Sequence, residues 1–209
     1  MDLLDAVETC RFLGREFLVF LWFESDVLEG QFEMPDGERF ELWFENQLVL
    51  ESEAAEQEIT RMRGAAPSAT SEAREALRRA KLPISARIRI DRGQQAFGFV
   101  FNAKTLNLSS VLLPQLIKEE VDERFFERMY LIDELEKMVD ALFERFLSFR
   151  LAPSWTTKFL PMIRTWVVDA SPVDPKVYRA VCKEAGPIAG AIRKGGAKAG
   201  WVLEGGATS

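Results

Sequence analysis

The sequence contains no histidine among its 209 residues and only two cysteines, Cys10 and Cys182. The lack of histidine excludes Ser-His-Asp and Cys-His nucleophiles, HExxH zinc helices and an imidazole base near neutral pH. Two cysteines are too few for a disulfide framework or a thiolate metal cage, and neither has a histidine to activate it. We therefore expect a protein without catalytic activity or cofactor, in a reducing, cytoplasmic setting.

The sequence also lacks a long apolar run. Its most apolar stretch, Phe17 to Phe23, has seven residues, whereas a helix that crosses a bilayer needs roughly 20. The first residues are acidic, whereas a signal peptide begins with basic ones. We expect a chain with no membrane span and no export signal.

Apolar periodicity predicts an α+β fold. Helical spacing predicts an N-terminal helix over residues 3–24, and alternating spacing then predicts antiparallel strands. Tight turns are expected at Pro35-Asp36-Gly37 and at Asn46-Gln47, which makes the first strands a meander. We expect a sheet of six or seven strands, over residues 31–34, 40–45, 48–50, 57–63, 84–92, 95–102 and 106–112.

Two more helices accompany the sheet. A basic helix is inserted between strands and runs from its cap at Ser71 to about Ala80. A long helix over 119–150 carries acidic residues at its start and Arg145 and Arg150 at its end, as the helix dipole favours. Its apolar seam fits a helix packed on the sheet, with a coiled coil between two copies as the alternative. The seam consists of Phe125, Met129, Ile132, Leu135, Val139, Leu142, Phe146 and Phe149.

These elements divide the chain into three parts. Residues 1–152 form the α+β domain. Residues 153–194 form a helical extension, with one helix from Trp155 to Val168 and a second that ends near Arg193. Residues 195–209 are rich in glycine and are expected to form a flexible tail.

The net charge of −6 hides an uneven distribution. Residues 1–60 carry 3 basic and 16 acidic side chains, residues 61–92 carry 9 and 3, and residues 93–209 carry 15 and 14. The net charges of these segments are −13, +6 and +1, which sum to −6. One short segment is therefore strongly basic within an acidic protein.

The basic side chains of this segment follow regular spacings. Arg74, Arg78 and Lys81 share one face of the inserted helix, and alternation along strands places Arg87 with Arg89 and Arg61 with Arg63. If these faces adjoin, a cluster of seven to nine cations results, which suits contacts with the phosphate backbone. A solvated surface partly neutralised by Glu72 and Glu75 is the alternative. The candidate DNA-binding residues are Arg61, Arg63, Arg74, Arg78, Arg79, Lys81, Arg87 and Arg89.

The long helix raises a second alternative. Carboxylates crowd its first turns, and Asp133, Glu134, Glu136 and Asp140 follow. Two or three such groups could hold Mg²⁺ in a nuclease. Acidic residues at a helix start more often serve the helix dipole and solubility, so we assign no metal ligand.

Three stretches together resemble a known family. They are residues 12–26, residues 71–101 with the helix that ends Arg79-Ala80-Lys81, and residues 126–151 with Trp155 and Trp166-Val167. Their order and spacing are similar to the C-terminal half of the recombination-associated RdgC family, in its delta-proteobacterial form. The resemblance covers about residues 10–168. The N-terminal half of the family and the segment after about residue 169 have no counterpart in the resemblance.

The resemblance implies a homodimeric, cytoplasmic and nucleoid-associated protein that binds double-stranded DNA without sequence preference and restrains RecA. In the family a helix that ends Ala-Gly-Lys precedes a strand pair, so its lysine corresponds to Lys81 and its glycine to Ala80. Other recombination proteins are further partners that the resemblance implies. The alternative function is a protein-interaction module that kept the fold. Neutralisation of the basic face by Glu41 and Glu45 would favour that alternative.

Overall fold

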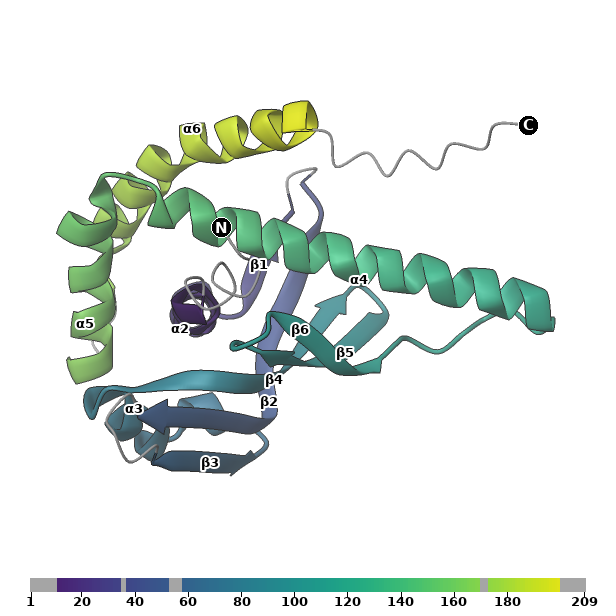
Figure 1. The fold of residues 1–209 in the computed structure, drawn as a ribbon, viewed down its shortest axis with the longest axis horizontal. Coiled ribbons are helices and arrows are strands. Elements are labelled where there is room, and N and C mark those ends of the chain that lie inside the picture. Colours follow the sequence, from purple (N-terminus) through teal and green to yellow (C-terminus); the bar gives the residue numbers. More distant parts are fainter. Residues whose placement is uncertain (1–10, 35–36, 53–57, 170–172, 200–209) are drawn as a thin grey trace, which may run out of the picture.

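The computed structural model describes residues 11–34, 37–52, 58–169 and 173–199. In these residues one antiparallel sheet of six strands carries helices on one face (Figure 1). The α+β class, the inserted helix and the long helix packed on the sheet are confirmed. The elements in chain order are α2 (Arg11–Val27), β1 (Gln31–Glu33), β2 (Arg39–Ser52), β3 (Ile59–Gly64), η1 (Pro67–Ala69), α3 (Ser71–Arg78), β4 (Lys81–Arg92), β5 (Gln95–Asn102), β6 (Asn107–Leu112), α4 (Val121–Arg150), η2 (Trp155–Phe159), α5 (Leu160–Asp169) and α6 (Pro175–Ala199).

The strand order is β1-β2-β4-β5-β6, and β3 pairs with the second half of β2, on the same edge as β1 and opposite β4. The predicted turn at Asn46-Gln47 is wrong, because β2 continues through it as one strand of 14 residues. Asn46 takes a φ of +52°, and the pairing with β4 shifts between Phe44 and Leu48. A left-handed asparagine suits a bulge as well as a turn. The predicted meander is also wrong at this point, since β2 pairs directly with β4 along its length.

The helix α2 lies at the centre of the molecule, between the sheet and the later helices (Figure 1). Phe17, Phe20, Trp22 and Phe23 are at most 1% exposed, since strands cover one side and α4 and α5 the others. The rings of Phe20 and Phe146 lie 5.5 Å apart. The part of the predicted N-terminal helix before Arg11 lies outside the described residues.

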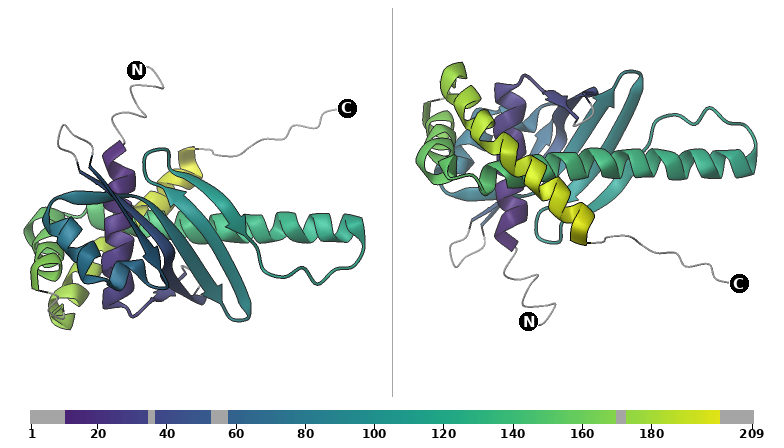
Figure 2. Two further views of the ribbon diagram at one scale, coloured as in Figure 1. Left: turned by 90° about the horizontal axis from the view of Figure 1, so that it is seen from below. Right: turned by 90° about the horizontal axis from the view of Figure 1, so that it is seen from above.

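The long helix α4 has two unlike halves. Its C-terminal half buries Leu135, Leu142, Phe146 and Phe149 in the core. Its N-terminal half runs on past the edge of the sheet, and the chain after β6 reaches its start through an extended segment, 113–120 (Figure 2). We call residues 113–130 the arm.

The helices after Pro153 share the core of the α+β domain. Trp166 of α5 packs edge-on against Trp22 at 5.6 Å, and Tyr178 and Val181 of α6 are buried. The predicted glycine-rich tail begins too early, because α6 continues to Ala199. No helix in the described part of the chain is long and apolar enough to cross a membrane.

Candidate nucleic-acid interface

The inserted helix directs its arginines toward other helices. Arg74 donates to Asp26 of α2 at 2.9 Å and to the carbonyl of Trp166 at 3.1 Å, and its guanidinium lies over the Trp166 ring. Arg78 donates to the carbonyls of Val167, at 3.1 Å, and Val168. These carbonyls are in the last turn of α5, where a helix lacks its own donors. Arg74 and Arg78 therefore hold α3 against α5.

Lys81 is buried, with 9% of its side chain exposed. Its ammonium donates to Thr60 Oγ1 at 2.8 Å and pairs with Glu58 at 3.0 Å, which ties the start of β4 to β3. Arg79 is exposed and pairs with Glu75 at 3.1 Å. Lys81 and Arg79 line a hollow of about 490 Å³, which two carboxylates also line. The hollow therefore carries both positive and negative charges. Its lining includes Arg78, Arg79, Lys81, Glu72, Glu75 and Thr60.

The remaining four arginines lie on one face of the sheet. Met62 of β3 and Ala86, Ile88 and Ile90 of β4 point into the core. The residues between them must point to the other face, because side chains alternate along a strand. That face, which we call the open face, carries Arg61 and Arg63 on β3 and Arg87 and Arg89 on β4.

The strand β2 separates the two arginine rows. Val49 of β2 pairs with Arg61 on one side and with Ser85 on the other. Two strand spacings place the backbones of the rows about 10 Å apart. Arg87 extends over β5, where Gly98 has no side chain to obstruct it.

Anions neutralise part of the open face. Arg89 pairs with Asp91 at 2.8 Å and with Glu45 at 3.4 Å, as the interaction-module alternative predicts for Glu45. These contacts raise the pKa of the Arg89 guanidinium. Glu41 accepts a hydrogen bond from Gln31 instead. Within the described ranges, Arg61, Arg63 and Arg87 have no ion-pair partner within 4 Å.

The expected cluster of seven to nine cations does not form. Arg74 and Arg78 point toward α5, Lys81 is buried, and the sheet arginines point to the open face. The strand pattern gave the correct shared faces, and the helix pattern gave that of Arg74 and Arg78, but Lys81 is the first residue of β4 and not part of α3. The partners of Arg74 and Arg78 lie up to 92 residues away, beyond the reach of local periodicity.

A second basic surface lies on α6. Lys176, Arg179 and Lys183 are exposed at spacings of three and four, which place them along one face of the helix. No acidic partner lies within 4 Å of them in the chain as described. The net charge of each segment did not reveal these cations, because residues 93–209 are nearly neutral as a whole. A count over the last helix alone would have found them.

The candidate metal ligands of α4 do not converge. Glu134 pairs with Arg92 at 2.7 Å, and Asp133 pairs with Lys137 at 2.7 Å. Arg92 and Lys137 lower the pKa of Glu134, with Arg92 the larger cause. The described residues contain no group of three or more acidic or cysteine side chains placed to hold a metal ion. The nuclease hypothesis therefore has no site in this part of the chain.

Cys182 lies beside a buried polar cluster of Glu24, Arg145 and Tyr178. Burial raises the pKa of its thiol, although the Arg145 charge opposes the rise. A raised pKa leaves less thiolate, which is the nucleophilic form. The surroundings of Cys182 thus favour a structural thiol.

Comparison with models of known protein families and with curated proteins gave no match for this chain.

Proposed function

We propose that the protein binds the phosphate backbone of double-stranded DNA through the open face, without sequence preference. The observation that carries the proposal is the placement of Arg61, Arg63 and Arg87 on one exposed side of the sheet, without ion-pair partners in the described ranges. Arginine binds phosphate through planar, paired donors. Arg89 completes the face as a partly neutralised fourth cation.

Only part of the predicted set of eight DNA-binding residues belongs to this proposed site. Arg74, Arg78 and Lys81 have structural partners, and Arg79 shares Glu75 with Arg78. A role in recombination, restraint of RecA, further recombination proteins as partners and nucleoid association rest on the resemblance alone. We also propose that the protein is a homodimer.

Fluorescence anisotropy of the full chain with a labelled duplex tests the open face. With four phosphate contacts, the logarithm of the affinity should fall with the logarithm of salt at a slope of about −3.6. This slope corresponds to a loss of roughly a hundredfold between about 50 and 200 mM salt. The triple variant Arg61→Glu, Arg63→Glu, Arg87→Glu should lower the slope to about −1 and remove most of the affinity.

Two controls separate a local site from general charge. The variant Lys176→Glu, Arg179→Glu, Lys183→Glu makes the same change of charge on α6 and should retain the wild-type slope. Arg78→Ala should lower thermal stability and retain the affinity of the folded protein. No binding by the wild type at about 50 mM salt, or equal losses in both triple variants, would contradict the proposal.

The pairing of Arg89 with Glu45 favours a second candidate, the protein-interaction module. In that case the open face binds no duplex at any salt concentration, and the exposed apolar arm is the functional surface. The anisotropy experiment distinguishes the two candidates.

A further inference from the structure

One edge of β2 has a gap between its two partner strands. On this edge β1 pairs with β2 as far as Glu41, and β3 begins its pairing at Asn46. The N–H of Leu42 donates to the carbonyl of Gly30 at 2.8 Å, so the backbone of Leu42 faces this edge. Backbone groups alternate in direction along a strand, so the N–H and C=O of Phe44 face the same edge.

These two backbone groups of Phe44 lie in the gap. Neither β1 nor β3 reaches them, and no loop among the residues that the structure describes forms a backbone hydrogen bond with Phe44. The Phe44 ring points into the core beside Trp22, and the residue is only 4% exposed. Shielded backbone groups are nearly always paired. We therefore expect a bound molecule that supplies both an acceptor and a donor.

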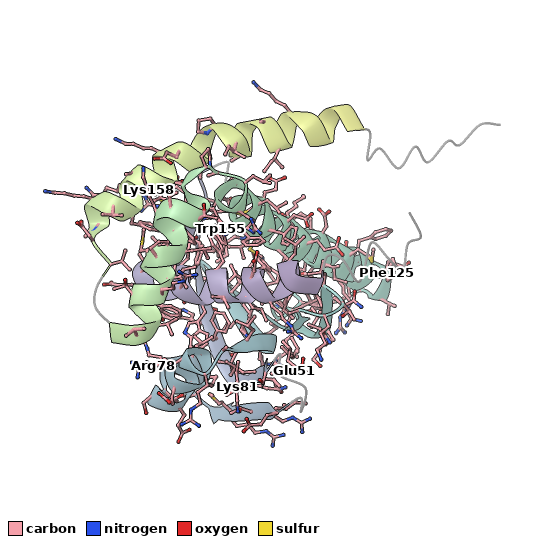
Figure 3. The ribbon with its side chains drawn as sticks, turned by 60° about the vertical axis from the view of Figure 1, so that its left-hand side comes forward. Glu51, Arg78, Lys81, Phe125, Trp155 and Lys158 are labelled. Atoms are coloured by element: carbon pink, nitrogen blue, oxygen red, sulfur yellow. The ribbon has the colours of Figure 1, made fainter. Side chains whose placement is uncertain are left out.

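A hollow of about 580 Å³ lies at this gap, and Phe44 is one of its lining residues. Its other walls come from the end of α2, from the loop before η1 and η1 itself, and from α3 and α5. Arg74 of α3 lies in the wall, one turn before Arg78, which Figure 3 shows between α3 and α5. The volume is in the range of about 300–1,000 Å³ that is usual for ligand sites. We call it the edge hollow.

The edge hollow has more negative than positive charge, since Asp26 and Glu29 line it together with Arg74. Arg74 and the indole N–H of Trp166 both donate to Oδ2 of Asp26, at 2.9 and 3.0 Å. Burial still raises the pKa of Asp26, although these two contacts oppose the rise. Glu29 has no ion-pair partner within 4 Å in the described ranges. A cation in the hollow would therefore stabilise both carboxylates.

Trp43 gives the edge hollow an aromatic wall on the open face of the sheet. Its side chain is 40% exposed. Its ring lies against Gly30, where a Cβ atom would be 2.8 Å from two ring atoms, so the indole is held in place. A fixed and partly exposed indole offers a contact surface to an apolar side chain of a ligand.

We propose that the edge hollow binds a short extended peptide of a partner protein, through one lysine or arginine residue whose backbone pairs with Phe44. In an antiparallel pair one residue supplies both the donor and the acceptor. Directly opposed side chains share a face of the sheet, so the basic side chain lies on the helix side, near Asp26. The next side chain of the peptide lies on the open face, beside Trp43.

The ligand must come from another molecule. Segments 1–10, 35–36, 53–57, 170–172 and 200–209 contain no lysine or arginine. None of them can supply the basic residue to its own chain. The inference is argued from the edge hollow alone and does not depend on DNA binding.

An NMR titration of the full chain with the capped peptide acetyl-Leu-Arg-Leu-amide, up to about 10 mM, tests the site. The amide signal of Phe44 should move and reach saturation. The same peptide with citrulline in place of arginine keeps the shape and loses the charge, so it should bind at least roughly tenfold more weakly. Methylation of the arginine backbone nitrogen removes the donor to the Phe44 carbonyl and should also weaken binding.

Variants of the protein assign the binding to the edge hollow. Asp26→Asn should weaken it by roughly tenfold or more. Ala66→Trp fills the hollow from an exposed position and should abolish binding. Ala65→Trp, next to it but outside the lining of the hollow, is the matched control and should bind as the wild type does. Thermal unfolding of each variant shows that it is folded.

Three results would each overturn the proposal. They are a Phe44 signal that does not move, equal affinity for the arginine and citrulline peptides, and wild-type affinity in Ala66→Trp. Anisotropy with a duplex reads the open face separately, so the failure of one proposal is distinct from the failure of the other.

Discussion

Arg145 of α4 donates from Nε and Nη2 to the two carboxylate oxygens of Glu24 in α2, at 2.6 and 3.0 Å. Glu24 is fully buried, and the hydroxyl of Tyr178 in α6 donates to the same carboxylate. One acidic side chain thus joins three helices. Burial and the nearby Glu24 charge raise the pKa of Tyr178, which keeps its proton available to the carboxylate.

Removing one partner of the pair between Arg145 and Glu24 should lower the stability of the protein strongly. Arg145→Met leaves the Glu24 carboxylate buried without its cation, and we expect a loss of about 3–5 kcal/mol in the free energy of unfolding. Urea denaturation measures it. Lys158→Met, which breaks the exposed pair with Glu184, is the control and should cost no more than about 1 kcal/mol. Similar small losses in both variants would show that the buried pair contributes little.

The carboxylate of Glu127 should make the arm sensitive to acid. Its two backbone hydrogen bonds lower its pKa from the ordinary 4.5, with the Ile117 bond the larger cause. Because the folded pKa lies below the unfolded one, the stabilisation is complete above about pH 4.5 and is lost as pH falls through the folded pKa. Hydrogen-exchange protection of the Ile117 and Lys118 amides should fall accordingly. Glu127→Gln should remove this dependence, and Asp133→Asn should retain it.

Gly14 should not tolerate a methyl group, although it lies within α2. Alanine in place of glycine ordinarily stabilises a helix by about 1 kcal/mol. A Cβ at Gly14 would lie 2.1 Å from the carbonyl oxygen of Ala103, so backbone must move. We expect Gly14→Ala to lower the free energy of unfolding by about 1–3 kcal/mol. Gly190→Ala, which meets nothing within 4 Å, should be neutral or stabilising, and an equal effect at both positions would refute the steric reason.

Replacement of Ala80 by glycine should stabilise the protein. Ala80 has a φ of +57°, in the left-handed region that favours glycine. Ala80→Gly should raise the free energy of unfolding by up to about 1 kcal/mol. Ala180→Gly, within α6, should lower it by a similar amount. Chemical denaturation of both variants checks the opposite signs.

Much of the fold followed from periodicity. The spacing of Leu135, Leu142 and Phe149 predicted α4 and the buried side of its second half, because both depend on neighbours within a few turns. Phe125 and Met129 continue the same spacing but are exposed, so the predicted seam is wrong for the first half of the helix. Whether the chain turns at Asn46 or continues as one strand depended on the pairing of β4 with both sides of that residue. The sequence of one strand alone does not reveal that pairing. The partners of Arg74 and Arg78 were equally distant, since Trp166 and Val167 come 92 and 89 residues later.

The central position of α2 has a consequence for synthesis of the chain. Phe17 to Phe23 are synthesised more than a hundred residues before the side chains of α4 and α5 that cover them. At about 5–20 residues per second, this aromatic segment waits for roughly 6–25 seconds without its partners. A nascent chain of this protein therefore exposes an aggregation-prone apolar helix. The yield of folded protein in the cell should depend on holdase chaperones during that interval.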